Sequence, residues 1–87
     1  MNKTEIKEFF DELAPFWDKD QNRNEEVVSL ILEKSGIRKG VSVLDVASGT
    51  GALFGDYLKL GASVTGIDIS EKMLKIAKEK FPQVNLI

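Results

Sequence analysis

The stretch V-L-D-V-A-S-G-T-G, residues 43–51, decides the fold of this chain of 87 residues. It joins a short apolar run, rich in β-branched residues, to a turn with two glycines, and a segment with helical spacing follows. Apolar runs of this length suit a strand that is covered on both faces, as in a parallel sheet. Gly49 and Gly51 lack a Cβ atom, so a ligand can approach the backbone there. The stretch therefore predicts a strand, a turn and a helix that build a ligand site together.

The segments around this stretch alternate between helical and extended patterns. Helical spacing of apolar residues marks two segments before it and two after it, and residues 64–69 and 84–87 are predicted as two further short strands. The order is therefore α-α-β-α-β-α-β, without repeats or low-complexity tracts. Strands that alternate with helices predict an α/β fold with a parallel sheet and right-handed crossovers.

The chain divides into an N-terminal part, residues 1–21, and an α-β-α-β-α-β core, residues 22–87. The first part is an amphipathic helix over residues 3–13, which we expect Pro15 to end, since the residue before a proline is pushed out of the helical region. Phe16 and Trp17 then lie in a short connector. They either pack the helix onto the body, which we favour, or help to roof a ligand site. Asn22 has capping-box spacing for the second helix.

The composition excludes several classes of function. The chain has no His and no Cys, which excludes disulfides, thiolate nucleophiles, imidazole bases and Cys/His zinc sites. Lys and Arg number 12 against 14 Asp and Glu, a net charge of −2, which provides no basic surface for nucleic acid or for an anionic membrane. No apolar run approaches the roughly 20 residues that span a bilayer. We therefore expect a cytoplasmic protein without nucleic-acid or membrane partners.

Two carboxylates stand where a parallel sheet binds its ligands. Ligands of open α/β sheets bind beyond the carboxyl ends of the strands, and Asp45 and Asp68 lie near those ends of the first and second strand. Asp68 follows Gly51 at close to the spacing of about 20 residues at which an acidic residue reaches ribose hydroxyls. A carboxylate suits a vicinal diol because it accepts two hydrogen bonds. The pair predicts a nucleotide-like ligand.

The details of the loop favour one nucleotide over another. The dinucleotide fingerprint G-x-G-x-x-G requires a third glycine where this chain has Phe54, and a phenylalanine there would crowd the contact between helix and strand. Asp45 also stands close to where a pyrophosphate would lie. A cofactor with a cationic end and no phosphate accepts that carboxylate more readily. S-adenosylmethionine is such a cofactor.

At these residues the chain resembles a known family. V-L-D-V-A-S-G-T-G, followed by V-T-G-I-D-I-S at residues 64–70, resembles the first two motifs of class I S-adenosylmethionine-dependent methyltransferases. The segment F-F-D-E-L-A-P-F-W-D, residues 9–18, is similar to the helix that precedes this core in small-molecule members, among them the quinone-biosynthesis C-methyltransferases. The resemblance implies a Rossmann-like core and transfer of a methyl group to a small-molecule acceptor.

The resemblance also implies a set of cofactor-binding residues. In the family, the first loop holds the methionine part of the cofactor, the acid at the end of the second strand binds the ribose, and two apolar residues pack on the adenine. In this chain the acid is Asp68, and the two apolar residues are Ile69 and Met73. The residues of the first motif are Asp45, Ala47, Ser48, Gly49 and Gly51. Ala47 departs from the pattern, because the family loop often begins with glycine. No residue is a credible general base.

The length limits what the chain does alone. The family's sheet has seven strands, and this chain supplies three of them, without the acceptor pocket. We therefore expect an inactive cofactor-binding half. An exposed strand edge then predicts self-association, strand exchange or a longer parent protein, and we favour the longer parent. Two alternatives remain, a fragment of an NAD-dependent oxidoreductase and a non-catalytic module that binds an adenosyl ligand or a partner.

Overall fold

A computed structural model describes residues 2–20 and 23–87 of the chain. The elements follow the expected alternation: α1 (Lys3–Trp17), the 3-10 helix η1 (Asp18–Asp20), α2 (Glu25–Ser35), β1 (Ser42–Val46), α3 (Phe54–Lys59), β2 (Ser63–Ile67), α4 (Glu71–Lys80) and β3 (Asn85–Leu86). Both later strands are shorter than predicted, and β2 ends at Ile67, so Asp68 and Ile69 lie in the turn after it. The α/β architecture with three parallel strands and flanking helices is confirmed.

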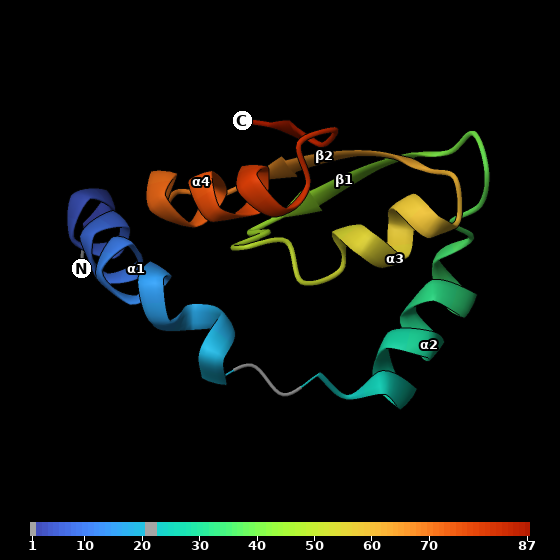
Figure 1. Cartoon of the computed structure of the whole chain (residues 1–87), viewed down its shortest axis with the longest axis horizontal. Helices are drawn as coiled ribbons and strands as arrows, with labels where there is room; N and C mark the ends of the chain where they lie inside the picture. The colour runs from blue at the N-terminus through green and yellow to red at the C-terminus, as the bar shows by residue number, and fades with distance from the viewer. Residues whose placement is uncertain (1, 21–22) are drawn as a thin grey trace.

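The sheet has the strand order β1-β2-β3, with all neighbours parallel. In Figure 1, α3 and α4 lie on the same side of the sheet. The prediction that β1 is covered on both faces is wrong, because Leu44 and Val46 are 62% and 69% exposed. Within residues 2–20 and 23–87 no helix covers that face. Ile67 and Ile87 extend it with 36% and 66% exposure, and we call these four residues the open face.

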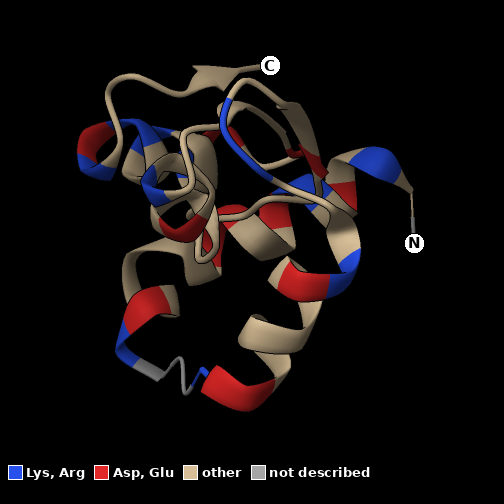
Figure 2. Cartoon of the chain, turned by 90° about the vertical axis from the view of Figure 1, so that its right-hand side faces the viewer, with Lys and Arg blue, Asp and Glu red and all other residues tan. Residues whose placement is uncertain are grey.

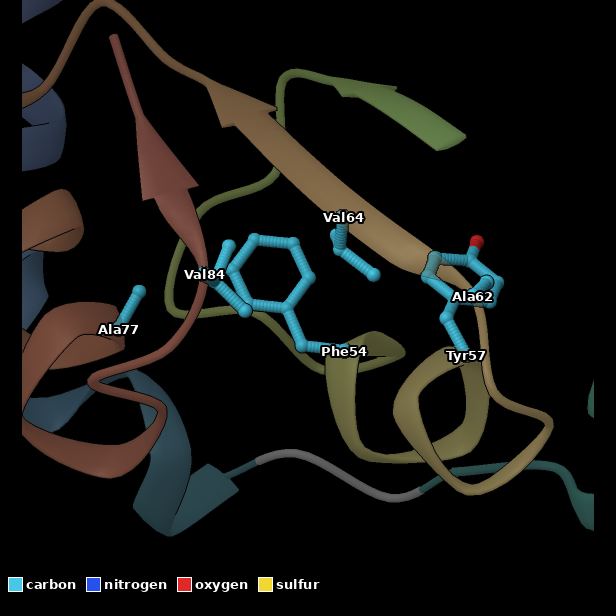
Figure 3. Close-up of a cluster of buried hydrophobic side chains, with 6 residues drawn as sticks. All are labelled: Phe54, Tyr57, Ala62, Val64, Ala77 and Val84. Carbon is cyan, nitrogen blue, oxygen red and sulfur yellow. The ribbon is translucent and has the colours of Figure 1, made fainter. Parts of the chain in front are cut away.

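The core lies between the sheet and the helices on its covered side. Its buried members come from α3, α4, the two later strands and the residues beside them: Phe54, Tyr57, Ala62, Val64, Ala77 and Val84. Figure 3 shows the Phe54 ring among Val64, Ala77 and Val84. Phe54 is fully buried and does not crowd the contact between helix and strand, contrary to expectation. A Cβ atom at Gly66 would lie 2.5 Å from its Cζ, so it is the glycine of β2 that makes room for the ring.

Helix α1 continues past the residue that was expected to end it. Its N-terminus is capped by Asn2, whose side chain accepts a hydrogen bond from the N–H of Glu5. Pro15 lies inside the last turn, where a proline removes a single bond of the helical ladder. The rings of Phe10 and Trp17 pack edge to face across that turn, with centroids 6.0 Å apart, and this contact supports the final residues.

Helix α2 begins and ends at residues suited to those positions. Its N-cap is Asn24, whose side chain accepts from the N–H groups of Glu26 and Val27. The predicted cap, Asn22, lies outside the described residues. At the other end Gly36 adopts a φ of 72°, as a closing glycine does. Arg23 ties the start of this helix to α3 by an ion pair with Asp56 at 3.0 Å.

Charge is distributed over the helices and almost absent from the strands. Figure 2 shows basic and acidic residues interspersed along the helical ribbons, and Asp45 is the single charged residue of the three strands. In the ranges that the structure describes, no helix is both long and apolar enough to cross a membrane.

Candidate functional site

A cavity of about 360 Å³ opens beyond the carboxyl ends of β1 and β2. Residues of α1, the two strands, the turns that follow them and the start of α4 line it: Phe10, Trp17, Val46, Ala47, Gly49, Ile67, Asp68, Ile69 and Met73. The lining is apolar apart from backbone groups and one carboxylate, that of Asp68. A mostly apolar cavity of this size with a few fixed polar groups is typical of small-molecule sites.

The loop between β1 and α3 has a backbone that only small residues accommodate. Gly51 has a φ of 81°, and a Cβ atom there would lie 2.3 Å from a ring carbon of Phe54. Ala47 also lies in the left-handed region, with a φ of 56°, although it carries a Cβ atom. The N–H of Ser48 donates to the carbonyl of Ile67 at 3.0 Å, which fixes the loop to the end of β2. The glycine at position 51 and the bond from Ser48 thus set the path of the loop.

Asp68 joins the two turns that border the cavity. Its Oδ2 accepts a hydrogen bond from the N–H of Gly49, and its Oδ1 accepts one from the N–H of Ser70, both at 2.8 Å. Each carboxylate oxygen has two lone pairs, so each can accept one further hydrogen bond. Asp68 is therefore fixed in orientation and still able to receive two hydroxyl groups of a ligand.

Asp45 lies beneath the loop and does not line the cavity. It pairs with Gly66 in the register of β1 and β2, and strand alternation places it on the helix-covered side with Val43. Burial raises the pKa of the Asp45 carboxyl above its usual range. The pKa of Tyr57 is also raised, mainly by burial of the phenol and further by the charge of Asp45. Asp45 is therefore a half-buried carboxylate of β1 that is not among the residues lining the cavity.

The eight predicted site residues fall into two groups. Five of them line the cavity: Ala47, Gly49, Asp68, Ile69 and Met73. The other three are not among the lining residues: Asp45 lies in β1, and Ser48 and Gly51 lie in the loop that follows it.

The two apolar residues predicted to pack on adenine both line the cavity, Ile69 from the turn after β2 and Met73 from the first turn of α4. Met73 is almost fully buried at 1% exposure, whereas Ile69 is 41% exposed. Met73 forms a fixed wall of the cavity, and Ile69 stands at its mouth.

Four lining residues were not predicted from the sequence as site residues, and two of these form an aromatic roof. Phe10 and Trp17 reach the cavity from α1, and the indole Nε1 lies 3.9 Å from the position of a Cβ atom on Gly49. Trp17 thus helps to roof the cavity, which is the alternative that we did not favour. Phe16 is 57% exposed and is not among the lining residues. The spacing of the α1 stripe could have indicated Phe10. Val46 and Ile67 look like ordinary strand residues in the sequence.

Comparison with known proteins gives one family. A family model described as "Methyltransferase domain" matches residues 43–87. The demethylmenaquinone methyltransferase of Tropheryma whipplei (strain Twist) is 36% identical over 85 residues, which cover 87% of this chain and 34% of that protein. The ubiquinone biosynthesis O-methyltransferase of Bordetella parapertussis is 36% identical over 84 residues, covering 90% and 35%. The chain thus spans about a third of the length of these curated relatives.

Solved structures share the fold. The [4+2]-cyclase SpnF superposes with a TM-score of 0.81 at 18% identity, over 100% of this chain and 42% of that one. The DhpI-SAH complex superposes with a TM-score of 0.71 at 26% identity, over 92% and 41%. The cyclase shows that this fold also serves other chemistry, so function has to be argued from the site.

Proposed function

The chain belongs to the methyltransferase-domain family, and from this membership we propose that it is the cofactor-binding part of an enzyme that methylates a small molecule with S-adenosylmethionine. The observation that carries the proposal is the cavity at the ends of β1 and β2, where the N–H groups of Gly49 and Ser70 hold the Asp68 carboxylate in place. The family as a class uses S-adenosylmethionine, and the chemistry of the lining residues fits this cofactor.

Each part of the cofactor has a matching part of the cavity. We assign the ribose diol to Asp68, whose two oxygens each keep a free acceptor site. The adenine lies between Ile69 and Met73, which offer apolar surface without a hydrogen-bonding side chain. The methionine part lies along the loop at Ala47 and Gly49, next to the indole of Trp17. The charge of Asp45 beneath the loop favours the cationic end of the ligand.

The residues of this chain act by binding and orientation. When bound, S-adenosylmethionine supplies the activated methyl group. The loop and Asp68 fix its position relative to the sheet, and Phe10 and Trp17 exclude water from one side of the cavity. Fixing a reactant in one geometry accounts for a large part of many rate accelerations. No general base lies among the lining residues, so we assign the acceptor and its activation to a part of the enzyme beyond this chain.

The two quinone-related relatives support a class of acceptor. Both carry names from quinone biosynthesis, one of them specified as an O-methyltransferase. We propose an aromatic small molecule of the quinone-precursor type as the acceptor.

We also propose three further properties: a division of the chain between residues 21 and 22, a cytoplasmic location, and self-association through the free edge of β1. The exposed backbone of that edge supports the last of them.

The test is a calorimetric titration of the chain with S-adenosylhomocysteine, with NAD titrated in parallel. We expect S-adenosylhomocysteine to bind and NAD not to bind. Asp68→Ala should weaken binding by about 1–2 kcal/mol, the usual cost of losing charge-assisted hydrogen bonds. Glu79→Ala, which removes an exposed carboxylate of α4, is the matched control and should leave the affinity unchanged.

Each outcome separates the alternatives. Binding of NAD in place of S-adenosylhomocysteine would establish the oxidoreductase alternative. Full affinity in Asp68→Ala would remove the ribose assignment and leave the ligand class intact. We expect this chain to bind the ligand but not to transfer a methyl group, as a cofactor-binding part would. A longer relative serves as the positive control in the methyl-transfer assay.

A further inference from the structure

Helix α1 is attached to both walls of the cavity by carboxylates that the proposed function does not use. Near its middle, Asp11 contacts the start of α4, and at its end, Asp18 contacts the loop after β1. Phe10 and Trp17, which form the aromatic roof, each precede one of these carboxylates by one residue. The two contacts therefore set where the roof lies.

The first contact is buried. Asp11 is 8% exposed and Ser70 is fully buried, and the Ser70 hydroxyl donates to Asp11 Oδ1 at 2.6 Å. The same oxygen accepts from the N–H of Lys72 at 3.3 Å, and the other oxygen pairs with Lys7 at 2.7 Å. Hydrogen bonds from Lys7 and Ser70 hold the pKa of Asp11 at about 2. The carboxylate is thus ionised at neutral pH and accepts from three donors, the Ser70 hydroxyl, the Lys72 N–H and the Lys7 ammonium.

The second contact lies beside the glycine loop. The hydroxyl of Thr50, the residue between the two loop glycines, donates to Asp18 Oδ1 at 2.6 Å, and Thr50 is 2% exposed. Lys80, at the end of α4, pairs with Asp18 Oδ2 at 3.0 Å. Burial raises the pKa of Asp18, but the bonds from Thr50 and Lys80 outweigh it, and the pKa lies below its usual range. This contact spans the loop and α4 together.

The first contact continues into the cofactor site. Ser70 uses its hydroxyl for Asp11 and its backbone N–H for Asp68 Oδ1, and Asp68 Oδ2 accepts from Gly49. An unbroken series of hydrogen bonds therefore runs from α1 to the carboxylate assigned to the ribose and on to the loop. A side chain whose partners are fixed in this way loses little further freedom when a ligand arrives.

We propose that Asp11 and Asp18 are positioning residues that close the aromatic roof over the cofactor, each by accepting a hydroxyl hydrogen bond from one wall of the cavity. This inference rests on the proposed function and adds the control of the site by α1. Neither residue touches the cavity itself. Their effect reaches the ligand through Trp17 and, for Asp11, through Ser70 and Asp68.

Trp17 provides the readout, because it is the single tryptophan of the chain. We would measure acrylamide quenching of its fluorescence and the affinity for S-adenosylhomocysteine in Asp18→Ala and Thr50→Val. Both variants should expose the indole to the quencher and weaken binding roughly tenfold, the factor that one charge-assisted hydrogen bond supplies. Asp18→Asn retains an oxygen for the Thr50 hydroxyl and should restore most of the affinity. Thr50→Val keeps the side-chain shape, so it remains informative if Asp18→Ala does not fold.

The matched control is Glu12→Ala, since Glu12 is an exposed carboxylate on the same helix. It should leave quenching and affinity unchanged. The double variant Asp18→Ala with Thr50→Val should lose no more affinity than Asp18→Ala alone, because that single change already removes the Thr50 bond. Additive losses, or wild-type quenching in both single variants, would overturn the proposal. If the wild-type chain does not bind S-adenosylhomocysteine, the proposed function fails, and the quenching comparison still decides whether the contacts hold the roof.

Discussion

Ala47 shows at the scale of one residue how the loop departs from its family pattern. A residue with a Cβ atom in the left-handed region costs about 1–2 kcal/mol, and glycine avoids this cost while losing more chain entropy on folding. With its φ of 56°, Ala47 therefore bears strain that the usual glycine would not. The strain is stored in the part of the loop that lines the cavity.

We expect Ala47→Gly to stabilise the chain by up to about 1 kcal/mol, the difference between the two costs. Urea denaturation followed by circular dichroism measures the change. Ala52→Gly is the control, since Ala52 has no positive φ and should lose stability instead. A loss of stability in Ala47→Gly would contradict the strain.

The close packing around Gly66 leads to a second prediction at the scale of one residue. Its missing Cβ atom leaves room for the Phe54 ring, and an added methyl group would also lie 2.9 Å from Ser48 Oγ and 3.0 Å from Leu86 Cδ2. We expect Gly66→Ala to destabilise the chain by about 1–3 kcal/mol, the usual cost of overpacking a core. Urea denaturation again measures it.

The control is Gly55→Ala, in helix α3. A Cβ atom there meets its nearest neighbour, a ring carbon of Phe81, at 3.5 Å, an ordinary contact. This variant should gain up to about 1 kcal/mol from helix propensity. Equal effects of the two substitutions would show that the Phe54 ring does not depend on Gly66.

The sequence predicts some of these residues and not others, for physical reasons. Asp68 and Gly49 could be placed at the site because parallel strands end at one edge of a sheet. Asp45 was placed with them, but strand alternation turns it to the covered side, and the register that fixes this depends on the whole sheet. The left-handed φ of Ala47 and the place of Gly66 under Phe54 depend on tertiary packing, which local patterns do not contain.

At the scale of the elements, the attachment of α1 is sensitive to acid. Asp11 has a pKa of about 2 in the folded chain against 3.8 as its ordinary value, so its ionised form favours folding. This contribution is present above pH 4 and is lost as the pH falls through the folded value. We expect the thermal midpoint of the wild type to exceed that of Asp11→Asn at pH 5, and the difference to shrink toward pH 2.

Other carboxylates also titrate in this range, so the difference between the two proteins is the quantity to measure, by circular dichroism at each pH. Lys7, which pairs with Asp11, stays charged throughout. A difference that stays constant from pH 5 to pH 2 would show that the contact between α1 and α4 does not depend on the charge of Asp11.

The elements themselves were largely predictable. Periodicity indicated the helices and strands in their correct order, and Gly36 marked the end of α2. Pro15 was misjudged because a proline in the last turn costs one backbone bond, which packing of Trp17 offsets. The coverage of β1 was misjudged because an apolar run indicates that a strand can be buried, and not which element covers it.

At the scale of the whole molecule, the chain leaves apolar surface and one strand edge uncovered. Leu44 and Val46 are exposed, and β1 has no neighbour on one side within the described residues. Free edges and apolar faces promote association. We expect sedimentation velocity to show larger species as the concentration rises, and Leu44→Lys to reduce them.

Ser29→Lys is a suitable control, because Ser29 is exposed on α2, away from the open face. It adds the same charge and should leave the association unchanged. A single sedimenting species at all concentrations would show that the edge of β1 and the open face do not mediate self-association.

The open face also has a kinetic consequence for the ligand. Val46 and Ile67 belong both to this face and to the lining of the cavity, so one wall of the cavity borders solvent. Within residues 2–20 and 23–87, a ligand bound there would have the aromatic roof on one side, while the side at Val46 and Ile67 stays open to solvent. Differences in affinity between related complexes arise mainly from the dissociation rate. The residence time of the cofactor should therefore be short on this chain and lengthen once another protein surface covers Val46 and Ile67.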